Sequence, residues 1–356
     1  MWARIEQTMA KQIRHVRPIA RDHADPTTQR IAAQIERDFG AFVPPFALHA
    51  PAPAVLAACW MMLRESLVPA HVDRRTKEAV ASAVSRLNAC TYCVDAHTAA
   101  LHALGETATA AAIADAAPAL DASGALGPFI AWAAATRSPD NRLLRQPPLS
   151  AAQGPEVIGI ALCFHYINRL VSIFLAPSPL PFKSARLKAI ARRLLSPILT
   201  GLLQRPLEPG ESLAWLPEAP SPPDFAWAAG NPTIAAAFAR AAASFESAGA
   251  AVLPATVRAL VRDRLHAWHG EEMGLGRRWL EDAVDLVDAE LRPAARLTLL
   301  TAFAPFQVDD VLLREVRRTL PDDAALIAAT AWASFAATRR IGTWLTVDQF
   351  TSGSRK

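Results

Sequence analysis

The sequence predicts an all-α protein, and three observations carry this prediction. Apolar residues recur at spacings of three and four along nearly every segment, which is the period of an amphipathic helix. Proline or glycine stands at the breaks between these segments, where helices begin and end. Alanine is abundant and aromatic residues make up only 7% of the chain, a composition that favours helices packed closely through small side chains. No run of alternating β-branched residues is long enough to predict a sheet.

Composition divides the chain into four parts. Prolines cluster in "APSPLPF" and "EAPSPPDF", so we expect residues 181–224 to connect two helical domains at 35–180 and 225–356, after an N-terminal helical arm at 1–34. The connection contains a basic stretch, for which we expect a linking helix packed on a domain. The alternative is a helix lying on an anionic membrane surface. The cations of this stretch are Lys183, Arg186, Arg192 and Arg193.

The two domains resemble a degenerate tandem repeat. "LVPAHVDRRTKEAV" is similar to "VLPATVRALVRDRL", and "FHYINRLVSIFL" is similar to "SFAATRRIGTWL", which aligns Arg169 with Arg339. The second copy has no cysteines at the aligned positions. We therefore expect any cysteine chemistry to belong to the first copy.

Charge and hydropathy exclude several classes of protein. A formal charge of +4 without an aromatic-plus-basic motif gives no indication of nucleic-acid binding. The one long apolar run, Val157–Leu175, contains His165, Asn168 and Arg169, so it predicts a buried helix and no stable membrane insertion. No signal-peptide pattern is visible and four cysteines do not make a disulfide framework, which predicts a cytoplasmic protein.

The stretch "NACTYCVDAH" brings two of the four cysteines together with a histidine. It follows the predicted helix "RRTKEAVASAVSRL" and opens a second one, with Asn88 as the expected N-cap and Gly105 as the expected C-terminal stop. Steps of three and four place Cys90, Cys93 and His97 on one narrow helical face. The sequence therefore predicts a compact group of two thiols and one imidazole.

Such a group can perform reversible thiol redox chemistry. The N-terminus of a helix stabilises a thiolate and lowers the thiol pKa, and a neighbouring imidazole can accept the proton. A second thiol one turn away can attack the oxidised first one and form a disulfide. Cys59 and Cys163 stand within apolar runs, and we expect both in the core.

Three other interpretations of the cysteine pair stay open at this level. "CTYCVDAHTAALH" has a zinc-like order of ligands, but all four would lie on one helix with His102 turned away from the rest, so we expect no metal. The cysteines can also be a buried structural pair, or one of them an acyl-transfer nucleophile, which leaves the second without a role. A second polar cluster, "HAWHGEE", fits no metal spacing, and we expect it to be solvated. It contains His266, His269, Glu271 and Glu272.

The residues around Glu78 allow two interpretations of its environment. It lies opposite the apolar stripe of its helix, where a carboxylate is usually solvated. The surrounding Ala81, Ser82 and Ser85 are also small enough for another helix to approach closely.

The segment "EAVASAVSRLNACTYCVDAH" matches an E-x11-C-x2-C-x3-H pattern. In this it resembles the alkylhydroperoxidase D-like proteins of the carboxymuconolactone decarboxylase superfamily. The preceding "FGAFVPPFALHAPAPAVLAACWMMLRESLV" is similar to the same proteins, and the resemblance extends over residues 35 to 176. It implies the helical alkylhydroperoxidase D-like fold and assigns the first domain to it.

The resemblance also implies a reaction, the thiol-dependent reduction of alkyl hydroperoxides. Cys93 would be the peroxidatic thiolate, and Cys90 the proton donor and resolving thiol that closes a disulfide with it. His97 and Glu78 would form the proton relay. No organic cofactor is implied; the partners would be a hydroperoxide, a dithiol or a thioredoxin-like or lipoyl protein as reductant, and further copies of the chain in a homo-oligomer.

Four further residues are second-tier candidates. Tyr92 stands where alkylhydroperoxidase D has a histidine, which leaves the relay intact but puts the efficiency of turnover and the identity of the reductant in doubt. His165, Asn168 and Arg169 form a polar stripe on an apolar helix. They either line the cleft near Cys93 or satisfy a buried helix end.

Two other functions remain as alternatives. The chain can be a non-catalytic helical scaffold or redox sensor that uses the cysteine pair as a latch. It can also be an enzyme resembling the carboxymuconolactone decarboxylases, although those enzymes lack the cysteine pair.

Overall fold

The computed structural model describes residues 10–19, 23–68, 70–115, 124–179, 196–197 and 199–345. Within these ranges the chain is helical, and the one β-type feature is an isolated antiparallel bridge between Ile13 and Leu175. The predicted all-α fold is confirmed. The basic stretch with Lys183, Arg186, Arg192 and Arg193 lies outside the described residues.

The first half consists of two long helices at its centre and several shorter ones around them. In chain order its helices are α2 (Pro26–Phe39), α3 (Pro44–Ala47), α4 (Pro53–Leu67), α5 (Arg74–Leu87), α6 (Thr91–Ala103), α7 (Thr107–Ala114), α8 (Gly127–Ala135), α9 (Arg142–Arg145) and α10 (Gly154–Phe174).

The second half again contains two long helices. Its elements are the 3₁₀ turns η2 (Leu213–Trp215) and η3 (Pro223–Ala228), α12 (Pro232–Val252), α13 (Ala255–Ala267), α14 (Arg278–Val284), η4 (Ala289–Leu291), α15 (Arg292–Phe303), η5 (Pro305–Gln307), α16 (Asp310–Val316) and α17 (Asp323–Gly342).

Local sequence determines where many of these helices begin. The side chains of Asp25, Asp73 and Asn231 accept hydrogen bonds from backbone N–H groups in the first turns of α2, α5 and α12, as N-capping residues do. Gly40 ends α2 at a φ of +84°, a conformation that glycine adopts without steric cost.

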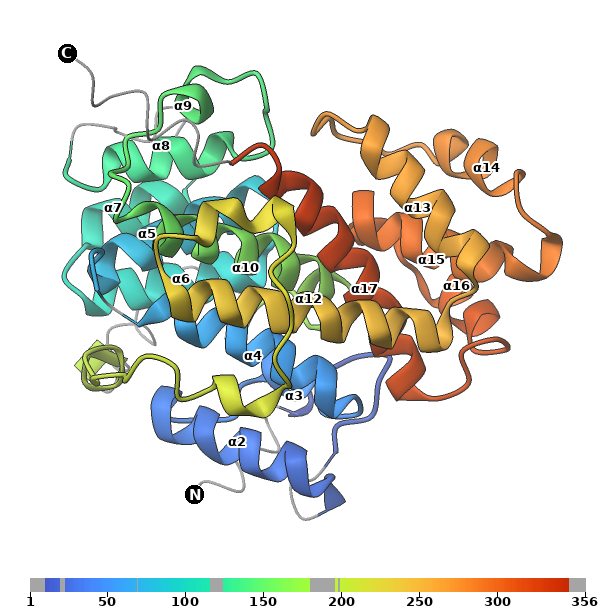
Figure 1. Cartoon of the computed structure of the whole chain (residues 1–356), viewed down its shortest axis with the longest axis horizontal. Coiled ribbons are helices and arrows are strands. Elements are labelled where there is room, and N and C mark those ends of the chain that lie inside the picture. The colour runs from blue at the N-terminus through green and yellow to red at the C-terminus, as the bar shows by residue number, and fades with distance from the viewer. Residues whose placement is uncertain are drawn as a thin grey trace.

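Helix α10 is the centre of the molecule, with α4 and α5 against it from the first half and α17 from the second (Figure 1). The long helix α12 lies along α4, so the two halves share one continuous core. α10 is the one described helix long and apolar enough to cross a membrane, but 94% of its apolar window is buried inside the protein. The predicted buried helix is confirmed.

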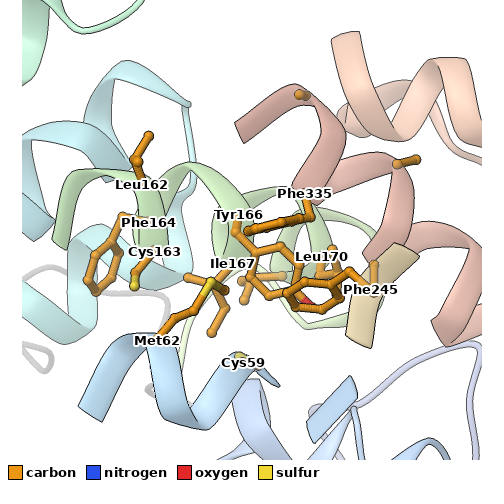
Figure 2. Packing of buried hydrophobic residues seen from close by; sticks show 14 of the residues in the cluster. Cys59, Met62, Leu162, Cys163, Phe164, Tyr166, Ile167, Leu170, Phe245 and Phe335 are labelled. Carbon is orange, nitrogen blue, oxygen red and sulfur yellow. The ribbon is translucent and has the colours of Figure 1, made fainter. Parts of the chain in front are cut away.

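Aromatic rings from both halves meet in this core (Figure 2). The Tyr166 ring on α10 lies 4.9 Å from Phe245 on α12, and Phe245 lies 4.6 Å from Phe335 on α17. Cys59 and Cys163 are buried in the same cluster, as predicted. Burial raises the pKa of both thiols, as expected for cysteines packed in an apolar core.

The domain boundaries and the tandem repeat stay predictions. Helix α2 runs across the expected boundary at residue 34. The pairing of α4 with α12 and of α10 with α17 is the arrangement that two repeats packed as a pseudo-dimer would have.

Candidate active site

The cysteine motif lies at a tight turn between α5 and α6. The backbone N–H of Asn88 still donates to Val84 O in the last turn of α5, and Ala89 then adopts a left-handed φ of +52°. Cys90 is the N-cap of α6, and its N–H donates to Ser85 O at 2.9 Å. The prediction of Asn88 as N-cap is therefore wrong, because Asn88 caps the C-terminus of α5 and its side chain turns toward α10.

The other end of α6 is as predicted. The helix ends at Ala103, and Gly105 follows with a φ of +90°. This is the left-handed conformation of a helix C-terminal glycine.

The two thiols of the motif are reduced and almost completely enclosed. Cys90 is 2% exposed and Cys93, in the first turn of α6, is 4% exposed. Burial raises the pKa of Cys93 well above its ordinary value, the neighbouring Cys90 raises it further, and a hydrogen bond with Asn168 acts in the opposite direction. The expectation of a lowered pKa is wrong for this enclosed state, because desolvation outweighs the effect of the helix N-terminus.

His97 is the imidazole of the motif. It lies one helical turn beyond Cys93 on α6, its side chain is 25% exposed, and its ring packs edge-on against Phe164 at 4.5 Å. The Nδ1 atom of His97 lies 2.6 Å from Oε2 of Glu78. Because this bond holds the proton on Nδ1, the second ring nitrogen, Nε2, is the one that can accept a proton.

Glu78 is buried at 2% exposure between Arg74 and His97. Its Oε1 accepts from Nε of Arg74 at 2.7 Å, while Oε2 receives His97. Burial opposes the charged form, but Arg74 and His97 outweigh it and lower the pKa of Glu78 to about 2. The interpretation of Glu78 as a solvated carboxylate is wrong, since α6, α8 and α10 all pack around α5.

A buried polar cluster joins the C-terminal end of α5 to α10. His165 and Asn168 of α10 are fully enclosed and both contact Asn88. The Asn88 amide nitrogen lies 3.2 Å from His165 Nδ1 and 3.0 Å from Asn168 Oδ1. Asn168 in turn donates to Ser85 Oγ at 3.2 Å. That this stripe lines a cleft near Cys93 stays a prediction.

Arg169 fits the second interpretation of the polar stripe, in which it satisfies a buried helix end. Its Nε donates to Ala302 O, at the C-terminal end of α15, at 3.0 Å, and it also donates to His165 O. It therefore satisfies a buried helix end in the second half.

Tyr92 belongs to a strap that covers the start of α6, formed by residues 12–14 and 175–179. Its hydroxyl donates to Gln12 Oε1 at 2.8 Å, and Gln12 Nε2 donates to Pro179 O at 3.2 Å. The backbone N–H of Ala176 donates to Gln12 O at 2.9 Å and joins the two segments of the strap, and the N–H of Arg14 donates to Phe174 O, at the end of α10, at 2.7 Å. Burial raises the pKa of Tyr92, and its hydroxyl anchors the strap through Gln12.

The other polar residues singled out from the sequence do not form a site. His266, His269, Glu271 and Glu272 are exposed, as predicted. Among the described residues no group of three or more histidine, cysteine or acidic side chains is placed to hold a metal ion. Two cavities of about 390 Å³ open elsewhere, one between α12, α13 and α17 and one beside the start of α5, and neither is lined by the two cysteines.

Comparison with known proteins places this geometry in a family. Residues 53–135, which include Glu78, both cysteines and His97, match the model of the carboxymuconolactone decarboxylase family. Over 340 residues the chain is 40% identical to an alkyl hydroperoxide reductase of Mycobacterium tuberculosis, and the alignment covers 94% of this chain and 95% of that protein. The chain belongs to the alkylhydroperoxidase D-like proteins of the carboxymuconolactone decarboxylase superfamily.

Membership in this family makes the chain an alkylhydroperoxidase-like oxidoreductase. The similarity to the mycobacterial protein runs through both halves, whereas the family model matches helices of the first half alone. No solved structure matches the chain.

Proposed function

We propose that this chain reduces organic hydroperoxides and that Cys93 is the attacking thiol. The observation that carries the proposal is the His97–Glu78 pair, joined at 2.6 Å and located one helical turn from a buried cysteine pair. An ionised carboxylate that orients an imidazole beside a thiol is an arrangement for moving a proton from sulfur. The name of the mycobacterial relative, alkyl hydroperoxide reductase, supports the same substrate class.

The first half of the reaction oxidises Cys93. His97 takes the thiol proton, and the thiolate attacks the terminal oxygen of ROOH. The O–O bond breaks, the alkoxide leaves as ROH with a proton from Cys90 or His97, and Cys93 becomes a sulfenic acid.

The second half regenerates the thiols. Cys90 sulfur attacks the sulfenic acid, a Cys90–Cys93 disulfide forms and water leaves. An external dithiol, either a small molecule or a thioredoxin-like or lipoyl protein, then reduces the disulfide. This cycle requires no metal and no organic cofactor in the chain, and we keep a cytoplasmic location and a homo-oligomer as predictions.

A redox sensor is the second candidate, and the burial of both thiols, at 2% and 4% exposure, favours it. In a sensor the same disulfide would form once and act as a latch. Continuous turnover distinguishes the two functions. A decarboxylase is disfavoured, because the cysteine pair would have no role in it.

The test is consumption of tert-butyl hydroperoxide in the presence of dithiothreitol, dihydrolipoamide or thioredoxin with its reductase. We expect multiple turnovers with the natural chain and none with Cys93→Ser, because serine stays protonated and cannot replace a thiolate. A Cys163→Ser variant is the matched control and should keep its activity. Oxidation of one equivalent without turnover under all three reductants would support the sensor.

The order of the two cysteines has its own test. In Cys90→Ser the first attack can still occur, so a dimedone-type reagent should label a sulfenic acid on Cys93. Labelling of Cys90 in Cys93→Ser, with no label in the reciprocal variant, would show that the roles are reversed.

A further inference from the structure

We propose that the second half of the chain contains a binding site for a small monocarboxylate with an apolar body, in the cavity between α12, α13 and α17. Aromatic and small side chains would hold the apolar body at one end of the cavity. The guanidinium groups of Arg339 and Arg340 would hold the carboxylate at the other. The proposal does not depend on the peroxidase function, because neither cysteine of the motif lines this cavity.

The cavity has the size and shape of a ligand site. Its volume is about 390 Å³, and small-molecule sites usually occupy roughly 300 to 1,000 Å³. The residues of α17 that line it recur at intervals of three and four between Trp332 and Thr343, so one stripe of this helix runs along the whole cavity. Helices α12 and α13 form the other two walls (Figure 1). The cavity is therefore a groove between three helices.

Polarity changes along the α17 stripe. Its first part presents Trp332, Phe335 and Ala336, and its second part presents Arg339 and Arg340. At the helical rise, Trp332 and Arg340 lie roughly 12 Å apart along the axis. A ligand that contacts both parts must therefore combine an apolar body with a polar head at a short distance from it.

The apolar end has a floor of rings that hold one another in place. Phe245 of α12 lies 4.6 Å from Phe335 (Figure 2), and Trp332 donates through Nε1 to Glu246 Oε2 at 3.0 Å. All three rings are buried, whereas Ala336, on the same stripe, is half-buried. A small side chain thus faces the groove beside the aromatic floor, and an apolar group that packs there is removed from water.

Glu246 makes this end unsuitable for a second anionic group. Its carboxylate is paired with Arg258 at 2.9 Å and with Arg262 at 2.6 Å. The Arg262 guanidinium also lies 5.6 Å from the centre of the Trp332 ring. A second carboxylate on the ligand would have to compete with Glu246 for these arginines, so we infer a monocarboxylate.

The other end offers hydrogen-bond donors in a fixed orientation. Arg339 uses Nε and Nη2 for Asp224, at 2.8 and 2.7 Å. Arg340 uses the same two nitrogens for Trp268 O, at 3.1 and 3.0 Å. Within the described part of the chain, the Nη1 group of neither arginine has a partner. Because both side chains are already held, ordering them costs little when a ligand binds, and a carboxylate accepts charge-assisted hydrogen bonds from guanidinium groups.

The charges around the groove also favour an anion. Three arginines and one glutamate line it, which gives a net charge of +2 with His266 counted as neutral. The ion-pair partners outside the lining, Arg258 and Asp224, add one charge of each sign and leave the sum unchanged. Arg340 binds a neutral carbonyl, and no described carboxylate forms an ion pair with it. It is therefore the arginine from which a ligand carboxylate gains most.

The experiment is isothermal titration calorimetry of the full chain with 4-phenylbutyrate. Two related probes each lack one of the two recognised parts: 4-phenylbutan-1-ol has no charge, and butyrate has no ring. Loss of one hydrogen bond to a charged group corresponds to about a tenfold change in affinity or more. We expect 4-phenylbutyrate to bind at one site per chain, and each of the other two probes to bind at least about tenfold more weakly.

Three variants locate the site. Arg340→Met keeps the apolar stem but removes the charge and the donors, and should weaken 4-phenylbutyrate binding at least about tenfold. Ala336→Leu keeps every charge and fills the groove beside the aromatic floor, and should abolish binding. Arg264→Met is the matched control, since Arg264 is exposed on α13 and does not line the cavity. Its affinity should equal that of the natural chain.

Absence of binding to the natural chain at millimolar 4-phenylbutyrate would overturn the proposal. Equal affinity for 4-phenylbutan-1-ol would overturn it as well, because the site would then recognise no carboxylate. If Arg340→Met does not fold, as judged by circular dichroism, Ala336→Leu decides. Unchanged binding in that variant would place the ligand elsewhere on the chain and reject the site.

Discussion

Replacing Glu78 by glutamine should destabilise the protein in a way that depends on pH. The pKa of Glu78 falls from an ordinary value of 4.5 to about 2 in the folded chain. At about 1.36 kcal/mol per unit, this difference of about 2.5 units corresponds to roughly 3 kcal/mol in favour of the ionised form. Glutamine imitates the protonated acid, so Glu78→Gln should lose about this free energy of unfolding at pH 7.

The sign follows from the direction of the shift. A folded-state pKa below the unfolded value means that the stabilisation is complete above pH 4.5 and is lost as the pH falls toward 2. By pH 3 the natural chain should have lost about 2 of the roughly 3 kcal/mol. The difference between parent and Glu78→Gln should therefore shrink to about 1 kcal/mol.

Urea unfolding followed by far-UV circular dichroism at pH 7, 5 and 3 measures both numbers. Glu281→Gln is the control, since Glu281 forms an ion pair with Arg296 at 2.6 Å but its side chain is 48% exposed. Exposed pairs contribute about 0 to 1 kcal/mol. A destabilisation by Glu78→Gln that is equally large at pH 7 and pH 3 would refute the reasoning, because it would come from packing and not from charge.

Three further predictions follow from the same geometry. Mild peroxide treatment should give a Cys90–Cys93 disulfide while the two core cysteines stay reduced, which peptide mass mapping after alkylation checks; oxidation of a core cysteine would contradict the site. His97→Ala should slow peroxide consumption by about 10² to 10⁴-fold without abolishing sulfenic acid formation, as steady-state kinetics will show. Lys77→Met should cost about 3 to 5 kcal/mol of unfolding free energy. The reason is that Glu156, now paired with Lys77 at 2.5 Å, would lose its buried counter-charge and keep the backbone N–H groups of Ala70 and His71 as donors. A double variant with Glu156→Leu should recover most of the loss.

Local spacing predicted the helical fold, and the family resemblance, which itself depends on spacing, supplied Glu78, Cys90, Cys93 and His97 as the candidate site residues. The period of three and four marks the helices, and E-x11-C-x2-C-x3-H spans two consecutive helices joined by a tight turn. Glu78 shows the limit of this reasoning. Its helix has a polar face by composition, and nothing local reveals that three other helices cover that face.

The contacts of Asn88 with His165 and Asn168 could not be predicted from the local sequence for a different reason. Asn88 and Asn168 are 80 residues apart, and their contact depends on how α5 and α10 are placed in register by the whole core. The available signal was the polar stripe of His165, Asn168 and Arg169 on an apolar helix, since buried polar groups need partners. That signal says that partners exist but not which ones they are. The contact between Gln12 and Tyr92 could not be predicted either, because Gln12 lies in a segment whose apolar residues show no regular spacing.

The position of α10 has a consequence for how this protein can be dissected. Residues 53–135, which match the family model, contain Glu78 and His97 but not α10, and therefore lack Asn168 and His165. A fragment that ends at residue 180 includes α10 but cuts it away from α15 and α17. It would leave Arg169 without Ala302 O, and Tyr166 O without the Ser334 hydroxyl that donates to it at 2.7 Å. A fragment that is meant to keep these contacts of α10 must therefore include α15 and α17 of the second half. The half without cysteines thus supplies part of the core that supports the half that has them.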